Sequence, residues 1–218
     1  IREQLNRGLP GRTPSFFFMD IQNSQVSDFE KFLMREAPDA KIERVPMMRG
    51  RVVRLNGILA PEVKAAENAA WVLEGDRGIT YSETLPDGSV LIEGEWWPAD
   101  YKGQPLVSME AEVARGLNLK TGDTVTVNVA GRNLTARIAN LRTVNWRSLG
   151  INFVFVFSPN TFAGAPHSFL ATAAFPSGSA SERELAILKN VANQFPTVTS
   201  LRVKDALDAI SGDRKSTR

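Results

Sequence analysis

Residues that could carry catalysis are scarce in this sequence, which contains one histidine, His167, and no cysteine. A Cys–His pair and a metal site made of several histidines are therefore excluded. The sequence also lacks a Gly-x-Ser-x-Gly turn, a phosphate loop ending in Gly-Lys-Ser/Thr and a Gly-x-Gly-x-x-Gly turn. His167 lies in a Gly-Ala-Pro-His loop before an expected strand, where we expect backbone or water to satisfy it. We expect neither catalytic residues nor a cofactor.

Two pairs of carboxylates have the spacing that acid–base catalysis would need. Glu93 and Glu95 would share one face of an extended strand, and Glu110 and Glu112 have the same spacing. A chain with 24 acidic residues produces such pairs by chance. Solvated surface is therefore the favoured interpretation of both pairs.

Five residues are candidates for contact with a ligand or a partner. Arg49 and Arg51 would share one face of a strand, suited to anionic groups, although an edge strand that uses charge against aggregation is the favoured explanation. Adjacent residues of a strand point to opposite faces, so Trp96 or Trp97 would be exposed unless something covers it. Burial of both at a junction between subdomains is the alternative. Trp146 precedes a long uncharged span.

The overall composition is that of an ordinary globular protein. The 218 residues include 26 Lys and Arg against 24 Asp and Glu, for a net charge of +2, and 43% are hydrophobic. Such a small surplus does not argue for nucleic acid. The absence of cysteine excludes a disulfide scaffold and is compatible with any compartment. The uncharged span 148–181 contains three prolines, so we expect two buried strands there rather than a membrane helix.

Hydrophobic periodicity indicates similar elements at both ends of the chain. Residues 15–21 and 42–55 are expected to be strands, with a helix between them from Ser27 to Pro38. Strands are also expected at 151–157, 169–175 and 198–203, a helix from Ser181 to Pro196 and a last helix from Asp205. Ser27 with Glu30, and Ser181 with Glu184, have the spacing of a capping box.

The middle of the chain has a different pattern. A hairpin is predicted over 78–95, with its turn at Pro86-Asp87-Gly88, and a second one over 124–141. The sequence thus predicts an α+β fold in which an α/β subdomain, 1–58 with 147–210, is interrupted by a β-rich insert, 59–146. Residues 211–218 are interpreted as a tail or an expression remnant. The abrupt ends of the chain suggest a piece of something longer.

Seven segments in order resemble one protein family. They are 16–22 (FFFMDIQ), 48–51 (MRGR), 75–81 (GDRGITY), 94–97 (GEWW), 119–124 (LKTGDT), 145–153 (NWRSLGINF) and 202–206 (RVKDA). The Leu-x-x-Gly-Asp turn is common among small β-barrels, whereas the whole series is specific. It is similar to the large extracytoplasmic domain of the YbbP-like ABC transporter permeases of the FtsX/MacB superfamily, over residues 9–210.

The resemblance implies a MacB-like periplasmic core, made of a porter-like α/β part and a β-rich part, between the first and second membrane helices. Residues 1–14 would then extend the preceding membrane helix. It further implies a cytoplasmic ATPase partner, transmission of ATP-driven helix movement to the periplasm, and extraction or export of hydrophobic, lipid-like compounds. It supplies no site residues. A docking module for a periplasmic esterase or thioesterase and a soluble hydrolase remain alternatives, and the isolated domain is expected to be monomeric.

Overall fold

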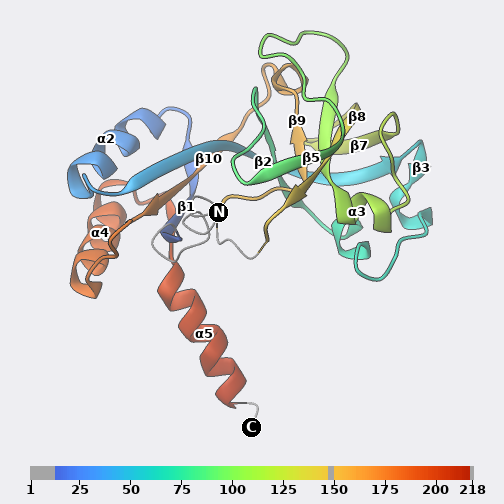
Figure 1. The fold of residues 1–218 in the computed structure, drawn as a ribbon. Coiled ribbons are helices and arrows are strands. Elements are labelled where there is room, and N and C mark those ends of the chain that lie inside the picture. Colours follow the sequence, from blue (N-terminus) through green and yellow to red (C-terminus); the bar gives the residue numbers. More distant parts are fainter. Residues whose placement is uncertain (1–12, 147–149, 217–218) are drawn as a thin grey trace. The chain divides into compact units, whose positions relative to one another are not determined.

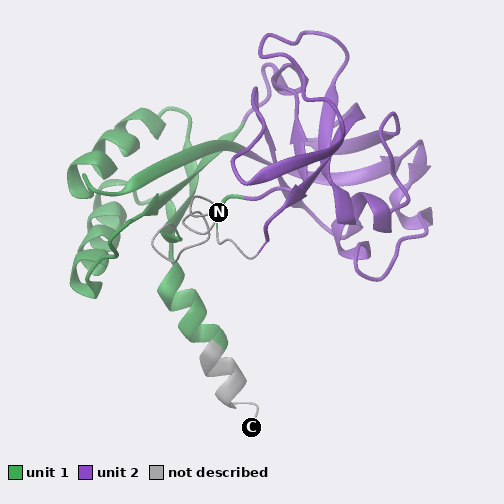
Figure 2. Cartoon of the chain, in the orientation of Figure 1, with its two compact units in different colours: residues 1–46, 147–151, 167–218 green, residues 47–146, 152–166 purple. Residues whose placement is uncertain are grey.

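The computed structural model describes residues 13–146 and 150–216 of the chain. It divides into two compact units, coloured separately in Figure 2: residues 1–46, 147–151 and 167–218 form the first, and residues 47–146 and 152–166 the second. The predicted membrane-helix extension at 1–14 and the tail at 211–218 lie largely outside the described side chains. In the described residues no helix is long and apolar enough to cross a bilayer.

The sheet of the first unit combines strands from both ends of the chain (Figure 1). Its central strands are β1 (Pro14–Gln22) and β10 (Ser168–Ala174), which pair antiparallel. β11 (Thr199–Arg202) pairs with β1 on the other side, and the strand order continues from β10 to β2 (Lys41–Leu55). Strands from both ends of the chain therefore pair within this sheet.

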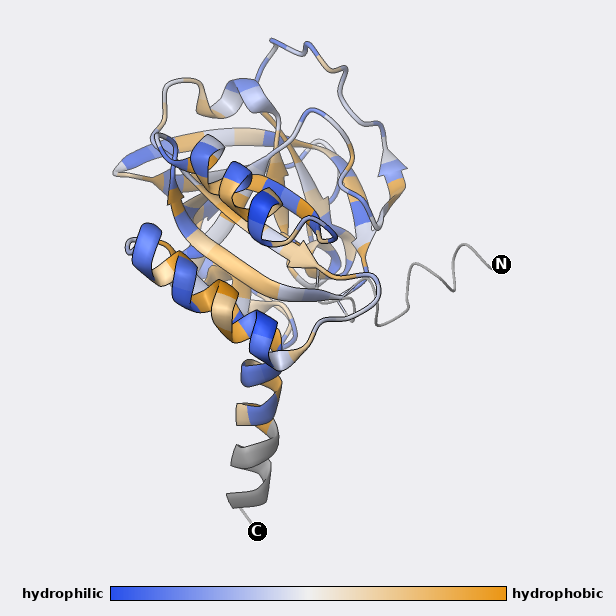
Figure 3. Ribbon diagram, turned by 90° about the vertical axis from the view of Figure 1, so that its left-hand side faces the viewer, coloured by the Kyte–Doolittle hydropathy of each residue, from blue (hydrophilic) through white to orange (hydrophobic). Residues whose placement is uncertain are grey.

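Two helices, α2 (Val26–Glu36) and α4 (Ser181–Gln194), cover this sheet and share its hydrophobic core. Phe16 and Phe18 of β1 pack into a cluster with Phe29, and the ring of Phe195 lies edge-on to Phe29 at 5.2 Å between centroids. Both helices alternate hydrophilic and hydrophobic positions around their axes (Figure 3), as a helix packed on one side requires.

The predicted capping boxes are both wrong. α2 begins after Gln25 and α4 after Ala180, and neither residue caps its helix through a side chain. Glu184 instead accepts a hydrogen bond from the hydroxyl of Ser179, two residues before the helix begins. The last helix, α5 (Val203–Ser216), follows β11 directly and starts two residues before the predicted Asp205.

The second unit contains a closed ring of six strands. In ring order these are β2, β4 (Arg77–Tyr81), β9 (Phe155–Phe157), β6 (Leu106–Glu110), β8 (Arg132–Val144) and β7 (Thr124–Val129), which pairs back to β2. Two of the pairings, β4 with β9 and β6 with β8, are parallel. Closure leaves no strand edge within the ring, and its interior holds the larger hydrophobic cluster.

The remaining elements decorate this barrel. β5 (Ser89–Gly94) extends the sheet from β8, and β3 (Ile58–Leu59) pairs with the end of β2. Four short helices are η2 (Ala60–Glu62), η3 (Ala70–Leu73), α3 (Ala111–Gly116) and η4 (Pro159–Phe162). The hairpin β7–β8 was predicted, but the hairpin over 78–95 is wrong, because β4 pairs with β2 and β9 while β5 pairs with β8.

Candidate functional site

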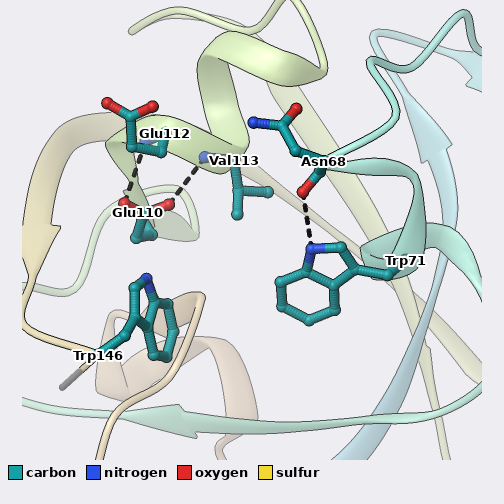
Figure 4. A pocket seen from close by; sticks show the side chains of 6 residues that line it. All are labelled: Asn68, Trp71, Glu110, Glu112, Val113 and Trp146. Carbon is teal, nitrogen blue, oxygen red and sulfur yellow. Dashed lines mark hydrogen bonds between the residues drawn. The ribbon is translucent and has the colours of Figure 1, made fainter.

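A pocket opens on the barrel unit where the start of α3, the segment around η3 and Trp146, just beyond the end of β8, meet. Its volume is about 300 Å³. Figure 4 shows the six residues that line it: Asn68, Trp71, Glu110, Glu112, Val113 and Trp146. The lining combines two indole rings, one valine, one amide and two carboxylates, and none of these six side chains is basic.

Glu110 shapes the pocket because it ends β6 and caps α3. Its two carboxylate oxygens accept hydrogen bonds from the backbone N–H groups of Glu112, at 3.1 Å, and Val113, at 2.7 Å. Capping of this kind satisfies amide groups that have no partner within the helix. Only 2% of Glu110 is exposed, so the expectation that this residue belongs to a solvated pair is wrong. Glu112 is exposed and forms a surface ion pair with Arg115 at 3.1 Å.

Trp71 forms one wall of the pocket and is held in a fixed orientation. Its indole N–H donates to the carbonyl oxygen of Asn68 at 2.9 Å. The guanidinium of Arg77 lies over the ring, 4.7 Å from its centroid, and donates to the carbonyl oxygens of Trp71 and Glu74. The side chain remains 39% exposed. Trp71 is not among the residues predicted from the sequence, because no motif surrounds it.

Trp146, one of the predicted contact residues, lies on the opposite side of the pocket from Trp71 (Figure 4). It follows the end of β8 by two residues and is 47% exposed. The exposed indole offers an apolar ring face together with an N–H donor.

A buried charge lies next to the capping carboxylate. Arg142 of β8 pairs in register with Glu110 of the parallel strand β6 and is only 1% exposed. It donates to the hydroxyl of Ser108 at 3.0 Å and to the carbonyl oxygen of Phe153. Burial lowers the pKa of Arg142 to about 10, and the charge of Glu110 opposes this shift. Arg142 therefore stays protonated at neutral pH and compensates the negative charge of Glu110.

Trp96 and Trp97 lie against each other rather than on opposite faces of a strand. Both follow Gly94, where β5 ends with a positive φ of 77°, and their ring centroids are 4.1 Å apart. Their indole N–H groups donate to neighbouring carbonyl oxygens, those of Glu83 and Ser82. Trp97 is buried inside the barrel unit, and neither ring lines the pocket.

Arg49 and Arg51 lie on the outer face of the barrel. β2 has β4 on one side and β7 on the other, so the explanation by an edge strand is wrong. In register with β7 and β8, Arg51 lies level with Asn128 and Asn133, and Arg54 is level with Thr126 and Thr135. Residues opposite one another in a sheet share a face. We call Arg49, Arg51, Arg54 and Arg137 the arginine face.

No carboxylate interrupts the arginine face within its own strands, because residues 47–55, 124–129 and 132–137 contain neither Asp nor Glu. Arg51 has an ion pair with Asp76 of the neighbouring loop at 3.6 Å, with both side chains well exposed. Exposed pairs of this kind contribute little to stability. The face therefore carries a surplus of positive charge.

The remaining chemical candidates lie in different segments of the chain. Glu93 and Glu95 are both exposed, and Glu93 accepts a hydrogen bond from the hydroxyl of Thr121 at 2.8 Å. His167 is half-buried in the first unit and its ring packs edge-on to Phe169, 5.3 Å between centroids. Within the described residues, no three His, Cys, Asp or Glu side chains group so that they could hold a metal ion.

Comparison with known proteins finds a similarity to an ABC transporter permease. No protein-family profile matches it. It is 29% identical over 197 residues to the ABC transporter permease YbbP of Escherichia coli (strain K12). The aligned region covers 89% of this chain and 22% of that permease, so the chain spans about a fifth of its relative's length. The similarity supports a relation to ABC transporter permeases.

Proposed function

We propose that this chain is the periplasmic domain of an ABC transporter permease subunit, located between the first and second membrane helices on the periplasmic side of the bacterial inner membrane. The observation that carries the proposal is the 29% identity to a permease over 89% of the chain. The seven matching segments of the resemblance extend across both units, which supports an assignment of the whole chain rather than of one unit.

The domain takes no part in covalent chemistry in this proposal. A separate cytoplasmic ATPase hydrolyses ATP, and movement of the membrane helices reshapes the periplasmic domain so that a hydrophobic, lipid-like compound is extracted or exported. The architecture supports such a role, because the units have separate cores and strand β2 continues from one into the other.

The location can be tested in the full-length permease because this chain has no cysteine of its own. Asp87→Cys would place one thiol on the exposed turn between β4 and β5 in a permease otherwise free of cysteine. We expect a membrane-impermeant maleimide to label it in intact spheroplasts. Labelling only after the inner membrane is broken would contradict a periplasmic location.

Coupling is tested with the full permease and its ATPase in vesicles. We expect ATP to drive the release of a fluorescent lipid to an acceptor. The double variant Arg49→Cys with Gly78→Cys would form a disulfide across the β2–β4 pair. We expect this disulfide to slow lipid release while ATP hydrolysis continues. These positions are directly opposite in the ladder. Unchanged release in the oxidised protein would contradict reshaping of the barrel, and absence of any release would contradict the lipid-like substrate.

A second candidate function, docking of a periplasmic esterase or thioesterase, is favoured by the arginine face. Arg49→Glu with Arg51→Glu should abolish co-purification of such an enzyme, whereas Arg115→Glu, an exposed change on α3, should not. The docking function would be contradicted if the Arg49→Glu, Arg51→Glu variant lost release of the fluorescent lipid but still co-purified with the enzyme.

A further inference from the structure

We propose that the pocket between Trp71 and Trp146 binds an organic cation, namely a quaternary or alkylated ammonium group. This inference does not rest on the proposed function, because it concerns binding by the chain itself and requires neither a membrane nor an ATPase. It rests on the aromatic walls of the pocket, on the charges that face it and on its size.

The aromatic walls supply the main attraction. Indole is the ring that attracts cations most strongly, and the pocket presents two of them, each more than one third exposed. Trp71 already carries a cation on one face, since the Arg77 guanidinium lies 4.7 Å from its centroid. This contact fixes the ring, and the indole N–H bond to Asn68 prevents it from turning.

The charges of the lining also favour a cation. Glu110 and Glu112 are the charged residues among the six that line the pocket, and both are acidic. Both oxygens of Glu110 already cap α3, and a quaternary ammonium group has no N–H to donate, so Glu110 acts on the ligand through its charge alone. Its charge is offset by Arg142, so the attraction from Glu112 matters more. The exposed ion pair of Glu112 with Arg115 is weak enough to yield to a ligand.

Size and polarity select an organic cation over a metal ion. A volume of about 300 Å³ admits a trimethylammonium group with a short chain. Metal ions such as Mg²⁺ and Ca²⁺ require several oxygen ligands, whereas two indoles and Val113 make up much of this surface. Methyl groups on nitrogen lose little hydration and pack against these apolar walls, as in aromatic cages that recognise choline or methylated lysine.

The test is NMR titration of the ¹⁵N-labelled chain with choline, followed through the indole N–H signals of its four tryptophans. We expect saturable shifts for Trp71 and Trp146. Trp96 and Trp97 do not line the pocket and serve as internal controls. The neutral isostere 3,3-dimethylbutan-1-ol has the same shape without the charge, and we expect it to bind at least tenfold more weakly.

Variants separate the contributions of the walls and the charge. Trp146→Ala should raise the Kd for choline about tenfold, the loss expected for a well-placed cation–π contact. Glu112→Gln should raise it two- to threefold, and Glu62→Gln, an exposed change on η2, should leave it unchanged. Trp146 makes no hydrogen bond on which the fold depends among the described residues, and an unchanged Tm will show that this variant is folded.

The source of the ammonium group is resolved by one further titration with hexyltrimethylammonium. Tighter binding than choline with the same indole shifts supports an amphiphile as the ligand, and equal binding supports a small free cation. Equal affinity for choline and its neutral isostere would overturn the proposal, as would shifts confined to Trp96 and Trp97 or the absence of saturable binding.

Discussion

Glu110 connects the pocket to the interior of the barrel. Its carboxylate accepts hydrogen bonds from the amide groups at the start of α3. Its negative charge also acts on the buried guanidinium of Arg142. A buried arginine without a nearby negative charge would be costly, since transfer of a charge from water is repaid only by such partners. The same side chain therefore holds the backbone of Val113 at the pocket and lowers the cost of burying Arg142.

We predict that Glu110→Gln lowers the free energy of unfolding by about 2 kcal/mol, because the cap of α3 loses one acceptor and the buried guanidinium of Arg142 loses a nearby negative charge. Urea denaturation followed by circular dichroism measures the change. Glu112→Gln is the matched control, an exposed change two residues away, and should alter stability by less than about 0.5 kcal/mol. Equal effects of the two variants would show that the charge of Glu110 is not needed.

At the residue scale, some side chains of the pocket could be predicted from the sequence, but the surroundings of these side chains could not. Trp146 was selected and lines the pocket, whereas Glu110 was assigned to the surface. The spacing of Glu110 and Glu112 is the same as that of Glu93 and Glu95, which are both exposed. What distinguishes them is that β6 ends at Glu110 and a helix begins, so the carboxylate turns inward to cap it.

β5 illustrates how a single glycine determines the position of an element. Gly94 has a φ of 77°, and a Cβ atom there would lie 2.2 Å from the carbonyl oxygen of Ala139 on β8. Gly88, at the other end of β5, has a φ of 82° with no atom within 4 Å of such a Cβ. The two glycines share the backbone cost and differ only in the steric clash.

We predict that Gly94→Ala lowers the Tm far more than Gly88→Ala does. The second change costs about 1 kcal/mol for a left-handed backbone alone, and the first should cost at least about 3 kcal/mol because β5 must also move away from β8. Thermal denaturation of both variants measures the difference in Tm. Similar Tm values would mean that β5 detaches from β8 without cost to the fold.

The ion pair of Asp39 and Arg183 joins the segment after α2 to the first turn of α4. Arg183 donates to both carboxylate oxygens of Asp39, one of these bonds measuring 2.9 Å, and this hydrogen bonding lowers the pKa of Asp39 below 3.8. A carboxyl whose pKa is lower in the folded state binds protons more readily when unfolded. Its contribution to stability is therefore complete above pH 3.8 and disappears as the pH falls through the lowered pKa.

We predict that wild type is more stable than Asp39→Asn at pH 6 and that the two become equal at a pH well below 3.8. Urea denaturation at several pH values measures the difference in the free energy of unfolding. Urea is uncharged and, unlike guanidinium chloride, does not screen the ion pair. Glu182→Gln, another exposed change at the start of α4, should show a smaller difference at pH 6. A difference for Asp39→Asn that persists unchanged at the lowest pH would contradict the role of its charge.

At the element scale, the pattern of hydrophobic residues predicted most strands but not their partners. β4 and β5 flank a Pro-Asp-Gly turn and were expected to pair, yet their partners are β2 and β9 for one and β8 for the other. Alternation reports which side of a strand is buried and does not specify its neighbour. The β7–β8 hairpin was predictable because its pairing is local.

At the scale of the whole chain, the barrel depends on strands that lie outside the insert proposed from the sequence. β2 ends at Leu55 and β9 spans Phe155–Phe157, whereas the sequence-based boundaries of the insert are 59 and 146. Composition changes near those positions, but ring closure is a property of long-range pairing. The compact unit accordingly extends over 47–146 and 152–166.

We predict that a fragment of residues 47–166 folds on its own and that a fragment of residues 59–146 does not. The longer fragment holds all the strand pairs of the ring, whereas the shorter one loses both neighbours of β4, namely β2 and β9. Burial of Ile79 and Phe157 in the core depends on these pairs. We expect cooperative thermal unfolding and dispersed amide signals from the longer fragment alone. A folded 59–146 fragment would show that its five strands, β4 to β8, make a stable core without ring closure.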